Sequence, residues 1–210
     1  SLINAGVENS KTATTINQVC GSGLAAVALG FNSLKLNDAK VLIAGGQESM
    51  TNSPHYQVLR KSEKNEESKM KDSMLIDGLI DVYNKYHMGV TAENVAEKYQ
   101  ITRKEQDEFA VNSQSKASAA IKLNKFKNEI VPIKLKNGKT FDTDEYPKIG
   151  TNIEKLSTLK TVFKENGTVT AGNASGLNDG AAALTLMTLK TAKDKNLKPL
   201  AKIVSWAQCG

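Results

Sequence analysis

The strongest constraint on the fold is a strand, helix and strand pattern within the first fifty residues. Residues 16–20 have the composition of a short strand, and residues 24–34 carry apolar side chains at helical spacing. Residues 41–44 form a short apolar run that we expect to end at Gly45 and Gly46, as a buried strand would. A strand, a helix and a strand in this order predict a βαβ unit with a parallel sheet, and therefore an α/β fold.

A polar and mostly helical block follows this unit. Thr102 and Glu105 have the spacing of a capping box, which predicts a helix from there to about Leu123. Residues 92–99 predict a second, shorter helix. The expected inner-face positions of the longer helix are Phe109, Ala110, Ala117 and Ala120.

The block also contains segments that favour loops and edges. Residues 61–71 are highly charged and predict an exposed loop or arm. Residues 130–135 alternate in polarity and include Pro132, which is typical of an edge strand.

A third segment is again rich in small residues. Residues 180–187 predict a buried strand, residues 188–196 a short helix and residues 200–206 another strand. The polar block is therefore predicted to be inserted between strands of one sheet.

Charge and composition exclude several classes of protein. Lysine and arginine outnumber acidic residues 28 to 22, but no single stripe carries the excess and the basic runs lack aromatic residues, so we expect no nucleic-acid partner. We interpret the excess of basic residues as ordinary solvated surface. The alternative is a diffuse basic rim that binds a small phosphorylated ligand. The most continuous apolar stretch, residues 23–31, is too short to span a membrane. Two cysteines exclude both a disulfide scaffold and a four-cysteine zinc site, and we expect no metal.

Cys20 is the candidate nucleophile. It lies between glycines where a strand is predicted to meet a helix, in the segment Asn-Gln-Val-Cys-Gly-Ser-Gly of residues 17–23. The unpaired amides and partial positive charge of a helix N-terminus stabilise a thiolate. The alternative is a buried structural cysteine. Cys209 follows a predicted strand with no basic neighbour and is interpreted as a passive thiol.

Two histidines and one small-residue loop complete the candidate groups. Either His55 or His87 could act as a base for the cysteine, and the alternative for each is an ordinary hydrogen-bonded histidine. Residues 167–180 are dense in small polar residues, which suits a loop that presents backbone groups and hydroxyls to an elongated ligand.

Several segments occur in an order that resembles the thiolase family, in its acetyl-CoA acetyltransferase (acetoacetyl-CoA thiolase) branch. They are residues 19–24, 44–50, 87–94, 106–107, 167–176 and 178–182. The resemblance covers essentially the whole chain, and residues 144–152 and 203–208 look most like the eukaryotic cytosolic type. Ketosynthases and hydroxymethylglutaryl-CoA synthases share the nucleophilic cysteine but not the His-Met-Gly motif at residues 87–89.

The resemblance implies a thiolase-like fold with αβαβα layers, of which this chain would hold most of the N-terminal half. Residues 1–50 would be the later part of that half, with the nucleophile. Residues 51–170 would be an inserted helical loop domain, residues 171–197 the end of the N-terminal half, and residues 198–210 the first strand of the C-terminal half.

The resemblance also implies roles for individual residues. Cys20 would be the nucleophile that becomes acetylated, and Lys148 stands where the family often has an arginine near the nucleotide phosphates. The other expected contacts to the substrate or its coenzyme A (CoA) portion are Leu79, His87, Met88, Phe163, Ala171, Ser175 and Leu177.

The implied reaction is condensation of two acetyl-CoA to acetoacetyl-CoA and CoA, and the reverse thiolysis, through an acetyl-cysteine. No cofactor is expected beyond the CoA thioester substrate. The family's Asn-Glu-Ala-Phe, Gly-His-Pro and Cys-Gly-Gly-Gly motifs do not occur in the 210 residues. We therefore expect an internal fragment, roughly half of a full chain and inactive alone. The alternative is a non-catalytic CoA-binding or interaction module.

Assembly and location follow only from the resemblance. The family implies a homo-oligomer, either a dimer or a tetramer. A cytoplasmic location is expected, with a mitochondrial one as the alternative.

Overall fold

The computed structural model describes residues 2–59 and 69–209, which divide into two compact units. Unit 1 comprises residues 1–49 and 179–210, and unit 2 comprises residues 50–178. The polar block is thus a continuous insertion between two strands of unit 1. The expected domain pieces, divided at residues 50, 170 and 197, and their assignment to parts of a thiolase chain stay predictions.

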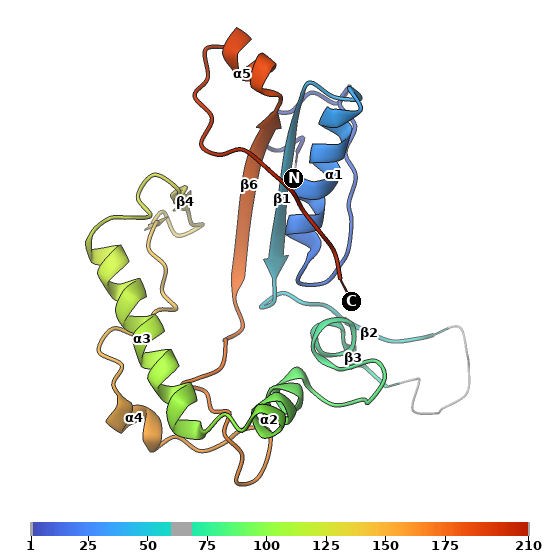
Figure 1. Cartoon of the computed structure of the whole chain (residues 1–210). Coiled ribbons are helices and arrows are strands. Elements are labelled where there is room, and N and C mark those ends of the chain that lie inside the picture. Colours follow the sequence, from blue (N-terminus) through green and yellow to red (C-terminus); the bar gives the residue numbers. More distant parts are fainter. Residues whose placement is uncertain (1, 60–68, 210) are drawn as a thin grey trace. The chain divides into compact units, whose positions relative to one another are not determined.

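Unit 1 is built on two antiparallel strands. Strand β1 (Val41–Ser49) pairs with β6 (Asp179–Met187) along their whole length, with Val41 opposite Met187 and Ser49 opposite Asp179. Figure 1 shows the two arrows running in opposite directions with helix α1 (Ser22–Lys35) beside them. Helix α5 (Leu189–Asp194) follows β6 directly and is capped by the Thr188 side chain.

Helix α1 packs closely on the sheet at Gly30, the buried residue of the helix. A Cβ atom there would come within 2.6 Å of a methyl of Leu42 and 3.0 Å of a methyl of Leu186. Large side chains on the strands remain exposed, including Ile43 at 56% and Leu184 at 53%. The apolar core of unit 1 is therefore small, and its buried members are Ala44 and Ala192.

The predicted parallel βαβ unit is wrong. Residues 16–20 form no strand, because Val19 takes a positive φ of 47° and the Gly21 N–H donates to the Gln18 carbonyl, which closes a turn. The strand at residues 200–206 is also absent, since no strand in the described part of the chain pairs with this segment. The strand and helix predicted at 180–187 and 188–196 are confirmed as β6 and α5.

The glycines predicted to end β1 lie inside the strand instead. A Cβ at Gly45 would overlap the backbone carbonyl of Ala182 on β6, and one at Gly46 would approach the Gly23 Cα to 3.5 Å. The approach at Gly45 excludes any side chain, whereas the contact at Gly46 is an ordinary van der Waals distance. The run of small residues therefore marks tight packing, not the end of the strand.

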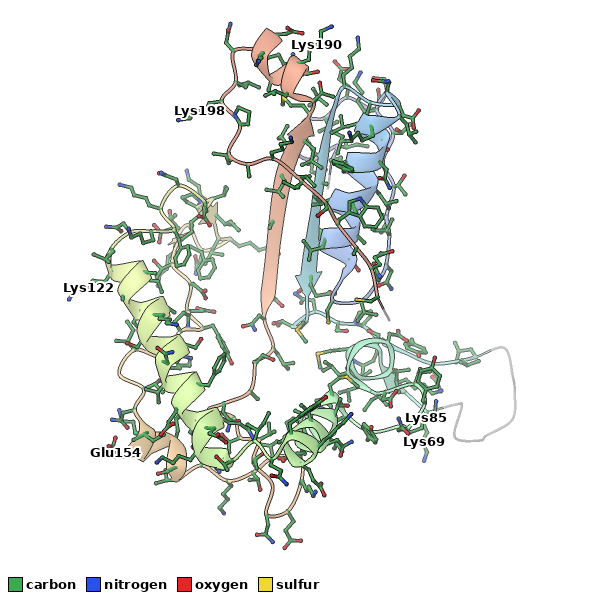
Figure 2. All side chains as sticks on the ribbon, viewed as in Figure 1. Lys69, Lys85, Lys122, Glu154, Lys190 and Lys198 are labelled. Atoms are coloured by element: carbon green, nitrogen blue, oxygen red, sulfur yellow. The ribbon has the colours of Figure 1, made fainter. Side chains whose placement is uncertain are left out.

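Unit 2 holds the longer helices. Helix α2 (Met88–Tyr99) begins earlier than predicted because the His87 ring caps it, and α3 (Arg103–Lys122) has the predicted capping box. The Thr102 Oγ1 accepts from the Glu105 N–H at 3.2 Å, and the Glu105 carboxylate accepts from the Thr102 N–H at 2.7 Å. Figure 2 shows Lys122 at the C-terminal end of α3, where its positive charge interacts favourably with the partial negative charge of the helix end.

Short elements complete unit 2. They are β2 (His55–Tyr56) paired with β3 (Lys71–Asp72), the π-helix η2 (Leu75–Leu79), β4 (Ile133–Lys134) paired with β5 (Thr140–Phe141), and helix α4 (Ile153–Ser157). The edge strand predicted at 130–135 is therefore confirmed only as two residues. The arm predicted at 61–71 lies mostly outside the described residues.

One predicted helix face is wrong in part. Phe109 of α3 is 77% exposed, whereas Ala110, Ala117 and Ala120 are half-buried. The buried residue of α3 is Asp107, whose carboxylate accepts from Arg103 of the same helix and from Asn173 beside it.

Candidate active site

Cys20 lies in a tight turn that leads into helix α1. The Ser22 Oγ donates to the Val19 carbonyl at 2.7 Å and accepts from the Gln18 N–H at 2.8 Å. The Asn17 Oδ1 accepts from the Val19 N–H at 2.9 Å. Every one of these bonds joins residues no more than four apart, so the turn is held by its own sequence.

The backbone of this turn is strained next to the cysteine. A positive φ is unusual for any residue with a side chain, and for a β-branched residue such as Val19 it is an outlier. Such strain costs about 1–3 kcal/mol and is concentrated at functional sites. The strain at Val19 therefore marks the segment that presents Cys20.

Helix α1 starts at this turn without a side-chain cap. Gly21 is its N-cap and provides no side-chain hydrogen bond, whereas the side chains of His87, Thr102, Asn152 and Thr188 cap the other α-helices of the described chain. The Ser22 N–H donates to the Val19 carbonyl at 3.2 Å, so the Gly23 and Leu24 amides and the partial positive charge of the helix start are what this turn offers to a negative group. Cys20 is exposed, so the alternative of a buried core cysteine is wrong.

Cys209 is exposed as well and lies in the same unit. Its neighbour Gln208 donates from Nε2 to the Gln18 Oε1 at 2.8 Å. Cys209 lies at neither a turn nor a helix start, so the structure adds nothing that would make it a nucleophile.

Four of the predicted substrate contacts lie in one region of unit 2. The His87 ring stacks on Phe163 with ring centroids 4.8 Å apart, and Met88 follows His87 at the start of α2. Leu79 is next to Ile80, which forms an antiparallel bridge with His87. Phe163 also lies flat against the backbone of Gly89, because a Cβ there would overlap its ring.

The hydrogen bonding of His87 argues against a role as base. Its Nδ1 accepts from the Gly89 N–H at 2.9 Å. In a neutral ring the proton is then assigned to Nε2, which makes that atom a donor. The other histidine, His55, is exposed and lies 3.8 Å from the Asp72 carboxylate between β2 and β3.

The other predicted contacts belong to a second region of unit 2. The Lys148 ammonium lies 5.8 Å from the centre of the Tyr146 ring, and that ring packs on Gly176 so closely that a Cβ there would overlap it. Ser175 and Leu177 flank this glycine and are exposed, as is Ala171. An isolated bridge between Thr161 and Thr170 connects this segment to the loop that carries Phe163.

Two carboxylates in unit 2 are buried, and the sequence patterns assigned them no role. Glu93 is 3% exposed and Asp107 is 1% exposed. Glu93 lies between Gly89 and Ala96, which are the other buried residues of α2. The available signal in the sequence was a glutamate at helical spacing from two small residues, Gly89 and Ala96, which places it on the same face of the helix as they are.

Two further features of the residues that the structure describes concern metal ligation and membrane spanning. They contain no group of histidine, cysteine and acidic side chains that could hold a metal ion. No helix among them is long and apolar enough to cross a membrane.

Comparison with known proteins identifies the family. The thiolase N-terminal domain matches residues 1–190. The acetyl-CoA acetyltransferase of Rhizobium meliloti (strain 1021) is 53% identical over 211 residues, which cover 99% of this chain and 54% of that protein. The corresponding protein of Paracoccus denitrificans is 50% identical with the same coverage.

A solved structure agrees with this assignment. The crystal structure of the Bacillus anthracis acetyl-CoA acetyltransferase matches with a TM-score of 0.88 and 39% identity, over 94% of this chain and 51% of that one. The chain thus spans about half the length of the relatives it matches. The predicted α/β thiolase-like fold of the N-terminal part is confirmed, and the chain belongs to the thiolase family.

Proposed function

We propose that this chain provides the acetyl-accepting cysteine and CoA-binding surface of an acetyl-CoA C-acetyltransferase. The protein would condense two acetyl-CoA to acetoacetyl-CoA and CoA, and run the reverse thiolysis. The observation that carries the proposal is an exposed cysteine at the strained, uncapped start of α1. It occurs in a chain about half identical to proteins named acetyl-CoA acetyltransferase.

The first step is transfer of the acetyl group to Cys20. Its thiolate attacks the carbonyl carbon of the thioester, a bond forms between Sγ and that carbon, and the bond to the CoA sulfur breaks. CoA leaves with the electron pair of that bond and takes up a proton.

The second step transfers the acetyl group onward. The α-carbon of another acetyl-CoA loses a proton and attacks the acetyl carbon, so that a carbon–carbon bond forms and Cys20 is released as a thiolate. By resemblance to the family, a Gly-His-Pro histidine and a Cys-Gly-Gly-Gly cysteine move these protons. Neither motif occurs in the 210 residues, so our proposal for this chain covers acetyl transfer and CoA binding.

Unit 2 offers surfaces suited to a CoA thioester. The stacked rings of His87 and Phe163 form a flat wall on which an extended pantetheine chain can pack, and the His87 Nε2–H is a donor there. The exposed Lys148 ammonium suits a phosphate as a point charge, without the fork geometry of an arginine. These roles, with those of Leu79, Met88, Ala171, Ser175 and Leu177, are part of the proposal.

Other properties stay predictions. The relatives reported above are bacterial, and the resemblance of residues 144–152 and 203–208 to the eukaryotic cytosolic type is carried by those residues alone. The expected dimer or tetramer, the cytoplasmic location with its mitochondrial alternative, and the absence of a cofactor rest on the family resemblance.

The test uses the two cysteines as a matched pair. The protein that contains this chain is incubated with acetyl-CoA and quenched in acid, and its peptides are weighed by mass spectrometry. We expect one acetyl group on Cys20 in the wild type and in Cys209→Ala, and none in Cys20→Ala. Acetylation at Cys209, or turnover by Cys20→Ala, would refute the proposal. Binding of CoA without any acetyl-cysteine would favour the alternative, a non-catalytic CoA-binding module.

A further inference from the structure

Two buried carboxylates in unit 2 have no part in the acetyl transfer, yet they bind the same segment. Glu93 lies on α2 and Asp107 on α3, and both face residues 167–173. Its backbone pairs with a neighbouring segment at one place, where Thr170 bridges to Thr161 and the Val162 N–H donates to the Val169 carbonyl at 3.1 Å. It leads directly into the residues proposed to contact CoA, so its conformation decides where they lie.

Glu93 binds the start of the segment through both carboxylate oxygens. Oε1 accepts from the N–H groups of Thr168 and Val169, each at 2.8 Å. Oε2 accepts from the Thr168 hydroxyl at 2.8 Å and from its N–H at 2.9 Å. A Cβ at Gly167 would overlap this carboxylate, so the glycine is needed for the approach.

Asp107 binds the end of the segment through Asn173. The Asn173 Nδ2 donates to the Asp107 Oδ1 at 2.9 Å and to the Thr168 carbonyl at 3.0 Å. The Asn173 Oδ1 accepts from the Thr170 N–H at 2.8 Å. One side chain, anchored by a buried carboxylate, therefore closes the segment into a loop.

Neighbouring groups fix the two carboxylates. Arg103 donates to the Asp107 Oδ2 at 2.8 Å and also to the Leu156 carbonyl at 2.6 Å. Gln106 donates to the Thr168 hydroxyl at 2.9 Å, so that hydroxyl must direct its own proton to Glu93. Buried charges are costly to keep unless every lone pair is used, and here each carboxylate accepts several charge-assisted hydrogen bonds.

On the basis of the proposed function, we propose that Glu93 and Asp107 are positioning residues. They hold residues 167–173 so that Ala171, Ser175 and Leu177 are presented to the CoA portion of the substrate. They touch no reacting atom, and their effect on the reaction is through substrate binding.

The test replaces Glu93 by glutamine, which keeps its shape but puts an amide group against amide donors. Glu97→Gln is the matched control, because Glu97 is one turn further along α2 and pairs only with the exposed Lys164. We expect Glu93→Gln to weaken CoA binding and raise the KM for acetyl-CoA about tenfold, as for loss of one charge-assisted hydrogen bond. Acetylation of Cys20 at saturating acetyl-CoA should be unchanged, and Glu97→Gln should match the wild type.

Hydrogen exchange separates positioning from general stability. We expect the Thr168 and Val169 amides to exchange faster in Glu93→Gln while the amides of β1 and β6 do not. Equal loss of protection throughout unit 2, or CoA affinity that is unchanged although these two amides exchange faster, would overturn the inference.

A second variant covers the case in which Glu93→Gln fails to fold. Asp107→Asn should also weaken CoA binding, with Glu108→Gln as its control, since the Glu108 carboxylate on the same helix pairs only with the exposed Lys104. A wild-type protein that binds no CoA would overturn the proposed function and the inference with it. A wild type that binds CoA normally, with variants that do so equally well, would overturn the inference alone.

Discussion

The two segments that carry the proposed function differ in how far along the chain most of their stabilising partners lie. The turn around Cys20 is held by hydrogen bonds between residues at most four apart, including those of Ser22 to Gln18 and Val19. The loop at residues 167–173 is held by Glu93, Gln106 and Asp107, which are 62 to 76 residues away in the chain.

This difference separates reactivity from recognition. Apart from the Gln208 amide, which donates to the Gln18 side chain, the bonds of the turn come from its own sequence, and its strain at Val19 can persist because these bonds fix it. The loop depends on how α2 and α3 pack, so it transmits any change in those helices to the substrate contacts. We therefore expect substitutions in the turn to change acetylation, and substitutions around the loop to change CoA affinity.

The largest effect should come from filling the space between the loop and Glu93. In Gly167→Ala the new methyl would overlap the Glu93 carboxylate and lie 2.9 Å from the Lys164 carbonyl. We expect a loss of about 3 kcal/mol of unfolding free energy, as for overpacking of a tight site, measured by urea unfolding. Gly78→Ala is the control, because nothing lies within 4 Å of its new methyl. Equal stability of the two variants would show that the loop adapts easily, contrary to the comparison.

Acid should remove the contribution of the Glu93 carboxylate to the stability of the fold. Burial raises its pKa, but the hydrogen bonds from Val169 and Thr168 outweigh this and hold the pKa below the ordinary value of a glutamate. A carboxyl with a lowered pKa stabilises the fold above its unfolded pKa, and this stability is lost as the pH falls through the folded value. At neutral pH the unfolding free energy of the wild type should exceed that of Glu93→Gln by about 2 kcal/mol.

The measurement is urea unfolding of both proteins at a series of pH values. The difference between them should stay constant down to about pH 5 and shrink as the pH falls below about 4. A difference that grows in acid would mean that Glu93 is protonated in the folded protein at neutral pH.

The same contrast explains what could be predicted from sequence. The capping box of Thr102 and Glu105 was predicted and is confirmed, because both partners lie in one helical turn. The turn at Cys20 was also singled out, since its glycines and cysteine are adjacent. The roles of Glu93 and Asp107 were not predicted, because the loop residues that they bind lie 66 to 76 residues further along the chain.

The errors in the fold have a related cause. The parallel sheet was inferred from apolar runs, but Val19 breaks the first run and β1 pairs with β6, which follows the whole of unit 2. Periodicity predicts which residues are extended but does not name the partner of a strand. The exposed Phe109 is a similar case, because polar bonds to Asp107 decide which face of α3 is buried.

The smallest predicted effect tests the strain at the cysteine turn. In Val19→Gly the positive φ becomes free of cost, while the unfolded chain gains entropy. We expect a net stabilisation of about 1 kcal/mol together with slower acetylation of Cys20, since the turn would no longer be held in one conformation. Urea unfolding measures the stabilisation, and quenched mass spectrometry measures the rate of acetyl-cysteine formation.

The control for this variant is Asn37→Gly, just after the end of α1. Asn37 also has a positive φ, of 63°, but asparagine adopts this region readily, so little strain is relieved there. We expect a change of only a few tenths of a kcal/mol and an unchanged acetylation rate. If Val19→Gly is less stable than the wild type, or is acetylated as fast, the local strain does not hold the nucleophile. The cysteine turn would then depend on distant contacts as the loop does, and the contrast between the two segments would disappear.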